Sequence, residues 1–154
     1  MIYARITTKD RDRGQRRIFR EIKMFNDFIL KIGVQGDRPQ KDPAAVVVYA
    51  TKNEFGDGVP ERSFIRSTVD EQVDNWQRLA FDLLRQLISS RQNAETVLQL
   101  VGERMQSDVQ KKIVNLRKPK NSPKTIALKG SSNPLIDTGR MRQSIRYVIE
   151  RKKS

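Results

Sequence analysis

Apolar side chains recur at helical spacing in two long stretches in the middle of the chain. From Val69 to Leu87 they stand three or four residues apart, and polar or charged residues occupy the positions between them. The same spacing runs from Ala94 to Leu116. This period places the apolar residues on one face of an α-helix. Because only the polar residues 89–93 separate the two stretches, the sequence predicts two long helices that pack antiparallel with their apolar faces opposed.

Polar residues at the starts of both stretches are typical of helix caps. Thr68 and Glu71 match the S/T-x-x-E capping box, in which two side chains bond to free backbone N–H groups. Asn93 can accept a backbone hydrogen bond at the start of the second helix. Trp76 lies on the apolar face of the first helix, which predicts a core residue and not a platform for stacked bases.

Two shorter stretches alternate between apolar and polar residues, which is typical of half-buried strands. The first covers residues 30–34 and is closed by a turn at 36–37, and the second covers residues 145–149. A strand needs a partner for its backbone N–H and C=O groups, so we expect these two strands to pair. Residues 2–7 alternate weakly and are a third candidate for a short strand.

The remaining segments give weaker signals. Residues 18–25 predict a short amphipathic helix with a basic outer face. Residues 44–55 are compatible with a helix, which Pro43 would suit in its first turn, or with a strand, because they contain three consecutive valines. Asp137 is placed to cap a short helix that ends near Ser144.

The whole pattern predicts one domain over residues 1–154, a usual length for a single domain. Its class is α+β, with a small antiparallel sheet packed against a long antiparallel helical hairpin. Three segments differ from the rest in composition. They are a basic N-terminal segment (1–27), an extended loop rich in proline and lysine (117–134) and a short basic C-terminal tail (151–154).

The charge is large and uneven along the chain. There are 31 Lys and Arg against 18 Asp and Glu, a formal net charge of +13. Residues 1–41 carry +6, residues 42–110 carry −4 and residues 111–154 carry +11. Basic ends indicate contact with polyanions, either nucleic acid or an acidic protein surface. A basic surface that meets only solvent is the alternative, because charge alone does not identify a partner.

The composition removes several classes of chemistry. The chain has no His and no Cys, which excludes Ser-His and Cys-His nucleophile pairs, thiolate metal sites and imidazole ligands. Asp70, Glu71 and Asp74 are the most clustered carboxylates, but the helix dipole stabilises negative charge at a helix start, and that role accounts for them. We therefore expect no catalytic, cofactor-binding or metal-binding residues and no enzymatic activity.

Membrane segments are also not expected. No segment reaches the roughly 18 apolar residues that span a bilayer. The first residues lack the apolar core of a signal peptide. We expect synthesis in the cytoplasm and no contact with a membrane.

Two segments resemble a known family. The first is YATKNEFG at 49–56, followed by VPERSFIR at 59–66, and the second is LKGSSNPLIDTGRMRQSI at 128–145. They are similar to the tail-completion or neck proteins of long-tailed bacteriophages, also called virion morphogenesis proteins. In that family an N-E-F-G turn precedes a P-x-R-P-F stretch, and a P-L-I-D-T-G-x-L-x-x-S-I stretch lies near the C-terminus. Ser63 stands where the family usually has Pro, and Met141 where it usually has Leu.

We expect the residues of these motifs to have structural roles. Gly56 is expected to end a helix in the left-handed conformation, and Phe55 to pack back onto the core. Arg62 and Arg66 are expected to pair with Glu54 or with a neighbouring subunit. Other motif residues are expected to support folding or assembly, for example by anchoring, capping or closely packing a turn; they are Asn53, Phe64, Pro134, Leu135, Ile136, Asp137, Thr138, Gly139 and Ser144.

The resemblance, which spans residues 28–147, implies a structural protein of the virion neck, made in the host cytoplasm. It would form a ring around the DNA channel and bind copies of itself, the head connector or adaptor and the tail terminator. In a closed ring, one surface patch of each subunit binds a different patch of its neighbour. The basic ends of one subunit would complement the acidic middle segment of the next. Contact with channel DNA would be non-specific and salt-dependent. The basic residues that we expect to contact DNA or a neighbour are Arg117, Lys118, Lys120 and Lys124.

Two other classes stay open on the residues alone. A stand-alone basic nucleic-acid-binding protein would act as a monomer or dimer, and salt would weaken its binding. Aromatic residues are not interleaved with the basic runs, which disfavours binding of single strands by stacking. An enzyme would need an acidic pair that converges in a pocket, for which the carboxylates at 70–74 are the candidates.

Overall fold

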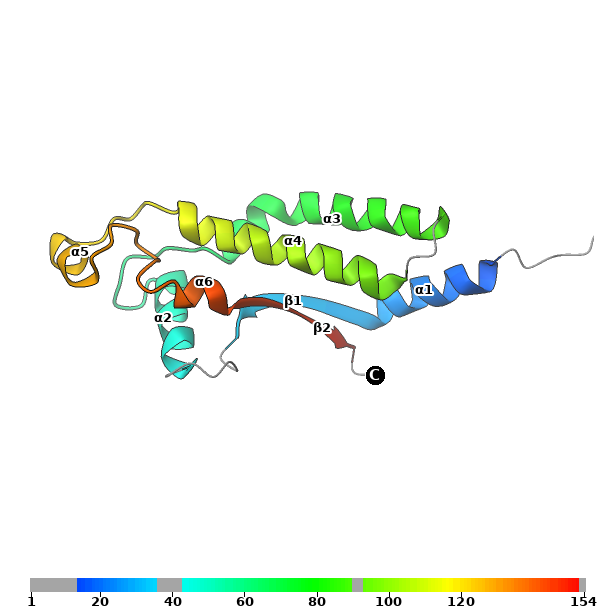
Figure 1. Cartoon of the computed structure of the whole chain (residues 1–154), viewed down its shortest axis with the longest axis horizontal. Helices are drawn as coiled ribbons and strands as arrows, with labels where there is room; N and C mark the ends of the chain where they lie inside the picture. Colours follow the sequence, from blue (N-terminus) through cyan, green and yellow to red (C-terminus); the bar gives the residue numbers. More distant parts are fainter. Residues whose placement is uncertain (1–13, 36–42, 90–92, 153–154) are drawn as a thin grey trace, which may run out of the picture.

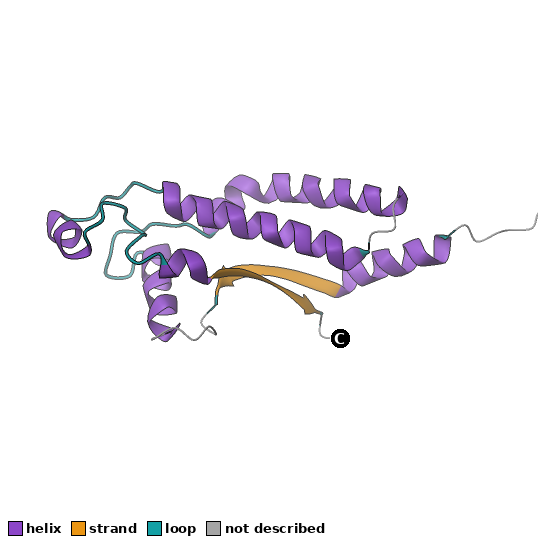
Figure 2. Cartoon of the chain, viewed as in Figure 1, coloured by secondary structure: helices purple, strands orange, loops and turns teal. Residues whose placement is uncertain are grey.

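The computed structural model describes residues 14–35, 43–89 and 93–152 of the chain. The candidate strand at 2–7, the basic residues before Gly14 and the end of the basic tail lie outside these ranges. Within them the chain forms six helices and two strands (Figures 1 and 2). In chain order the elements are α1 (Gln15–Asp27), β1 (Phe28–Val34), α2 (Pro43–Phe55), α3 (Arg66–Ser89), α4 (Ala94–Asn115), α5 (Pro123–Lys129), α6 (Arg140–Ser144) and β2 (Ile145–Arg151).

Helix α4 lies at the centre of the fold. Helix α3 runs antiparallel along one side of α4, and the two strands run along the other side (Figure 1). At one end of this stack α1 leads into β1, while α2 and α6 lie at the other end and α5 lies farther out still (Figure 1). The predicted α+β class is confirmed, and the sheet meets the helical hairpin through α4.

The predicted pairing of the two strands is also confirmed. Strands β1 and β2 are antiparallel, from Phe28 opposite Arg151 to Val34 opposite Ile145. Because side chains alternate along a strand, one set faces α4 and the other faces away. The set that faces α4 is apolar and consists of Leu30, Ile32, Val34, Ile145, Tyr147 and Ile149.

A glycine in the interior of α4 lets the sheet approach closely. The Tyr147 ring lies against Gly102, so closely that a Cβ there would fall inside the van der Waals distance of three ring atoms. Glycine weakens a helix interior by about 1 kcal/mol relative to alanine. At this position the residue type is explained by its packing against β2.

The apolar core forms two clusters along α4. Near the start of the helix, Leu87, Val97 and Val101 are buried together, with side chains of α1 and β1 packed against them. Near its end, Val109 and Ile113 are buried beside residues of both motif segments. These partners from outside the helical hairpin are Ala50, Phe64, Leu135, Met141 and Ile145.

Helix α3 does not begin as the sequence predicts. Its first residue is Arg66, and Thr68 already lies within the first turn, where its hydroxyl donates to the Phe64 carbonyl at 2.6 Å. Glu71 forms an ion pair with Lys112 of α4 at 2.5 Å. The predicted Thr68–Glu71 capping box is therefore wrong.

The predictions made from the sequence for Asn93 and Trp76 agree with the structure. The Asn93 side chain accepts from the Thr96 N–H at 2.9 Å, which confirms the predicted cap. Trp76 is buried, as predicted, and its ring N–H donates to Asp108 at 2.9 Å. The ambiguous stretch before Phe55 is a helix, α2.

The segment 117–134 is only partly an extended loop, because it contains α5. Ser122 caps this helix by accepting from the Thr125 N–H at 3.2 Å, and Pro123 occupies its first turn. Proline is tolerated there because the first N–H groups of a helix have no intrahelical partner. The extended chain is confined to residues 116–122 and to the turns after Gly130.

Candidate functional site

The two motif segments meet at the end of the molecule formed by α2, α5 and α6. A cavity of about 860 Å³ opens between them. The first motif contributes Asn53 and Arg62 to its wall. The other lining residues come from α2, the turn after it, the segment 120–129 and the second motif; those discussed below are Val46, Tyr49, Lys120, Asn121, Thr125, Lys129, Leu135, Asp137, Thr138, Gly139, Arg140 and Met141.

The buried carboxylate of Glu54 caps the start of α3. Only 4% of the residue is exposed. Its oxygens accept hydrogen bonds from the N–H groups of Phe64, Ile65 and Arg66 at 2.8–3.0 Å. The Ser63 hydroxyl donates to the same carboxylate at 2.9 Å. The N–H groups of Ile65 and Arg66 are among those that a helix leaves without an intrahelical partner, so Glu54 takes the role predicted for Thr68 and Glu71.

The same contacts set the acidity of Glu54. Burial by itself raises its pKa, because it disfavours the charged form. The backbone N–H groups of Ile65, Arg66 and Phe64 and the Ser63 hydroxyl favour the carboxylate and outweigh burial, so the pKa of Glu54 lies below its ordinary value. Glu54 is consequently a stable anion with filled hydrogen-bonding sites, which suits a structural role.

Arg66 closes this cluster from the outside. Its guanidinium donates to Glu54 Oε1 at 3.3 Å and to Glu61 at 2.7 Å, which confirms the predicted pairing with Glu54. It also lies 4.7 Å from the centre of the Phe55 ring. Phe55 is 61% exposed, so the prediction that it packs back onto the core is wrong. The Arg66 guanidinium instead lies over one face of the Phe55 ring in a cation–π contact.

Gly56 ends α2 as predicted. Its φ is 77°, and its N–H donates to the Lys52 carbonyl at 2.9 Å. A Cβ at this position would lie 3.1 Å from Cβ of Glu61. The turn therefore requires glycine for its conformation and leaves little space for a side chain.

Arg62 is a buried cation with neutral acceptors. It is 5% exposed and does not pair with Glu54. The alternative, pairing with a neighbouring subunit, stays a prediction. Its guanidinium donates to the side chain of Asn53 at 3.0 Å and to that of Asn121 at 3.1 Å. It also donates to two backbone carbonyls, of Pro119 at 2.9 Å and of Lys120 at 3.3 Å. Arg62 thereby fastens the chain at 119–121 to α2.

Asn133 and Pro134 connect the second motif to its surroundings. The Asn133 side chain donates to the Val114 carbonyl at 2.9 Å and accepts from the Leu135 N–H at 3.0 Å. The Pro134 carbonyl accepts from the Tyr49 hydroxyl at 3.4 Å and from Lys129 Nζ at 3.3 Å. The second motif is thus tied to the ends of α4, α2 and α5.

The rest of the second motif anchors and reverses the chain. Leu135 is buried in the core and Ile136 packs against it, as predicted for anchoring residues. The buried Ser144 hydroxyl donates to the Met141 carbonyl at 2.8 Å. Thr138 is exposed on the cavity rim.

The predicted cap of the last helix is wrong. Helix α6 begins at Arg140 after Gly139, which has a φ of 77°, and no side chain caps it. Asp137 is exposed and lines the cavity. The nearest atom to a Cβ built on Gly139 is 3.8 Å away, so glycine is explained there by its conformation and not by close packing.

The charges that line the cavity are mostly positive. Four cations, Arg62, Lys120, Lys129 and Arg140, share the wall with one carboxylate, Asp137. Burial lowers the pKa of Lys129, Asp137 counteracts that shift and the positive charge of Arg62 adds to it.

Tyr49 lies on the same wall. Burial raises the pKa of its hydroxyl, while the charge of Arg62 and a hydrogen bond with Asn53 act in the opposite direction. The phenol therefore stays protonated at neutral pH and acts as a hydrogen-bond donor.

Sequence reasoning missed three residues of this site. Tyr49, Asn121 and Lys129 were not singled out, although Tyr49 lies one helical turn before Asn53 and so shares its face. Lys129 lies within the second motif segment, but its contact with the Pro134 carbonyl gives no separate signal in the sequence. The local sequence around Asn121 carries no signal either, because its role depends on contact with the distant Arg62.

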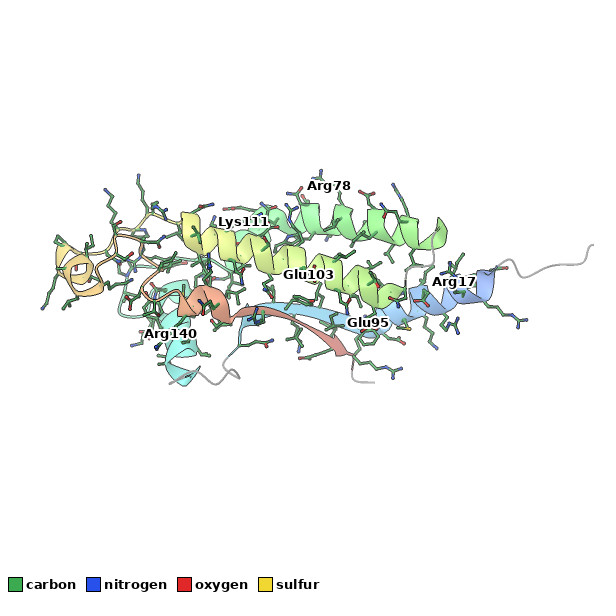
Figure 3. All side chains as sticks on the ribbon, viewed as in Figure 1. Arg17, Arg78, Glu95, Glu103, Lys111 and Arg140 are labelled. Carbon is green, nitrogen blue, oxygen red and sulfur yellow. The ribbon has the colours of Figure 1, made fainter. Side chains whose placement is uncertain are left out.

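The four basic residues predicted to contact DNA or a neighbour, at 117, 118, 120 and 124, are all exposed. Of these, Arg117 donates to the carbonyls of Val114 and Leu116 at the end of α4, and Lys120 lines the cavity. Positive charge is not confined to this region, since the labelled Arg17, Arg78 and Lys111 lie along the length of the molecule (Figure 3).

The carboxylates at 70–74 do not form a pocket. Asp70, Glu71 and Asp74 are exposed on the first turns of α3, and none of them lines the cavity. Their place near a helix N-terminus and the contact between Glu71 and Lys112 account for them.

Comparison of the chain with protein-family models, with curated proteins and with solved structures finds no match. Among the described residues, no helix combines the length and the apolar character needed to cross a membrane.

Proposed function

We propose that the chain is a structural component of the bacteriophage neck, a tail-completion protein that forms a ring between the head connector and the tail and surrounds the DNA channel. The observation that carries this proposal is how the first motif uses its two buried charged residues. Glu54 and Arg62 bond to backbone and amide groups of this same chain. The motifs thus build the shape of one end of the molecule, as the resemblance implies.

Exposed apolar and basic side chains are available for contacts between subunits. On α2, Val48 is 54% exposed and Phe55 is 61% exposed, which leaves apolar side chains on the outside of the helix. The cations at 117–124 are exposed at the same end of the molecule. Apolar contacts with a charged rim are typical of protein interfaces.

The proposed role is non-enzymatic. The motif residues with the strongest polar contacts fix helix ends and loops. Interactions with the head connector, the tail terminator and channel DNA belong to the same proposal.

A gene-disruption experiment tests the role in assembly. A nonsense mutation in this gene should yield DNA-filled heads and finished tails that do not join, and the wild-type gene supplied in trans should restore virions. Virions of normal yield and appearance without the protein would contradict the proposal.

Stand-alone nucleic-acid binding is the second candidate, favoured by the net charge of +13 and by the exposed cations at 117–124. Such a protein should shift duplex DNA as a small species, with an affinity that falls steeply between 50 and about 200 mM salt. Absence of a shift at low salt would exclude it.

A further inference from the structure

We propose that the cavity between α2, α5 and α6 is a binding site for an acidic peptide segment of a partner protein, with carboxylate side chains directed at Arg62 and Lys129. This inference rests on the cavity alone and stands whether or not the chain is a neck protein.

The first step of the argument is the charge of the wall. Four cations and one carboxylate line the cavity, and the carboxylate, Asp137, is exposed. A concave surface of one sign concentrates its field and attracts ions of the other sign. The cavity therefore favours an anionic occupant.

The second step is the state of Arg62. A buried guanidinium normally has a carboxylate partner, because a charge removed from water is costly unless it is paired. Among the described residues Arg62 has no such partner, and its four acceptors are all neutral. A guanidinium has five N–H donors, and in the described part of the chain one donor of Arg62 has no acceptor.

The third step is the position of Lys129. Lys129 is half-buried and lines the same cavity as Arg62 and Asp137. Its one described hydrogen bond goes to a neutral carbonyl, that of Pro134. A bound carboxylate would face two cations and stabilise the charged form of Lys129.

The remaining wall fits a peptide. Val46, Leu135 and Met141 supply apolar surface, while Asn121 and Thr125 supply amide and hydroxyl groups that can bond to a backbone. The volume of about 860 Å³ lies within the range of small-ligand sites. Duplex DNA is bound through phosphates along an extended surface, so a concave site of this limited volume favours a short peptide over a duplex.

The test uses the full chain and a defined probe. A capped peptide of six glutamates is titrated at 50 mM salt and followed by NMR, with a capped peptide of six glutamines and a short DNA duplex as comparisons. The variant carries Lys129→Gln and Arg140→Gln. Its matched control carries Lys111→Gln and Arg78→Gln, because both residues are exposed on the helical hairpin and neither lines the cavity.

The proposal predicts saturable binding of the glutamate peptide, with shifts centred on Tyr49, Asn121 and Leu135, and no binding of the glutamine peptide. The cavity variant should lose about tenfold in affinity, and the control should stay within about twofold. Equal losses in both variants would overturn the proposal, as would absence of saturable binding. Stronger binding of the duplex at the same residues would assign the cavity to nucleic acid instead. Circular dichroism melts of both variants exclude loss of folding as the cause.

Discussion

The carboxylate of Glu54 accepts hydrogen bonds from both the backbone N–H of Arg66, at 2.9 Å, and its side-chain Nε, at 3.3 Å. One residue at the end of α2 thereby fixes the first residue of α3 in two ways. This relationship sets the direction of the long helical hairpin relative to α2. It also explains why a glutamate in the N-E-F-G turn and an arginine twelve residues later belong to one structural unit.

The first prediction concerns removal of the charge on Glu54. Glu54→Gln keeps the size of the side chain but replaces one carboxylate oxygen with a donor that faces N–H groups. We expect a loss of about 2–3 kcal/mol in the free energy of unfolding, measured by urea denaturation. Glu103→Gln is the matched control, because Glu103 is exposed on α4 and should change stability by less than about 0.5 kcal/mol. Equal stability of the two variants would refute the capping role.

The second prediction is the pH dependence of that contribution. The pKa of Glu54 is lower in the folded chain than in the unfolded chain, where a glutamate titrates near about 4.3. Its contribution is therefore complete above the unfolded pKa and is lost as the pH falls through the lower, folded pKa. The stability difference between the wild type and Glu54→Gln should be constant from pH 7 to about pH 5 and should shrink at lower pH. Urea denaturation at each pH measures it, and a difference that grew on acidification would be inconsistent with this assignment.

The third prediction concerns the planar guanidinium group of Arg62. Arg62→Lys keeps the charge but cannot reach four acceptors on α2 and at 119–121 together. We expect a loss of about 2–4 kcal/mol in the free energy of unfolding and faster amide hydrogen exchange at 120–122. Arg78→Lys, at an exposed site on α3, is the control and should leave both quantities unchanged. Unchanged exchange at 120–122 in Arg62→Lys would show that Arg62 does not hold this segment.

The fourth prediction tests the packing of the sheet on α4. Gly102→Ala should destabilise the chain by about 1–3 kcal/mol, because its Cβ would meet the Tyr147 ring. Gly33→Ala in β1 meets no atom within 4 Å and should be close to neutral. The double variant Gly102→Ala with Tyr147→Leu should recover part of the loss. If Gly102→Ala were as stable as Gly33→Ala, the close approach of α4 and β2 would be wrong.

The regular part of the fold could be predicted from the sequence because its signals are local. Period and spacing located α1, the α3–α4 hairpin and both strands, and the need of each strand for a partner predicted the pairing of β1 with β2. Asn93 was predicted as a cap because its acceptor and the Thr96 N–H lie three residues apart.

The helix ends and the site were harder because distant residues determine them. The Thr68–Glu71 pattern is a valid capping signal, but the nearby Glu54 carboxylate is better placed and takes the N–H groups at 64–66. Likewise Arg62 donates to acceptors at 119–121, which no periodicity connects to α2. The cavity exists only where these segments converge. Some of its residues could be predicted as motif members, but Asn121 and Thr125 lie outside both motifs, and no local pattern shows that these side chains share one wall.

The proposed place of this chain in a phage neck is tested most directly by electron cryo-microscopy of phage particles purified from cells in which this gene is expressed. The account predicts a ring of density at the head–tail junction into which the α3–α4 hairpin, the two-stranded sheet and the α2–α6 end fit as one unit in every subunit. Neck density that is fully occupied by other proteins, with this chain absent from the particle, would contradict it.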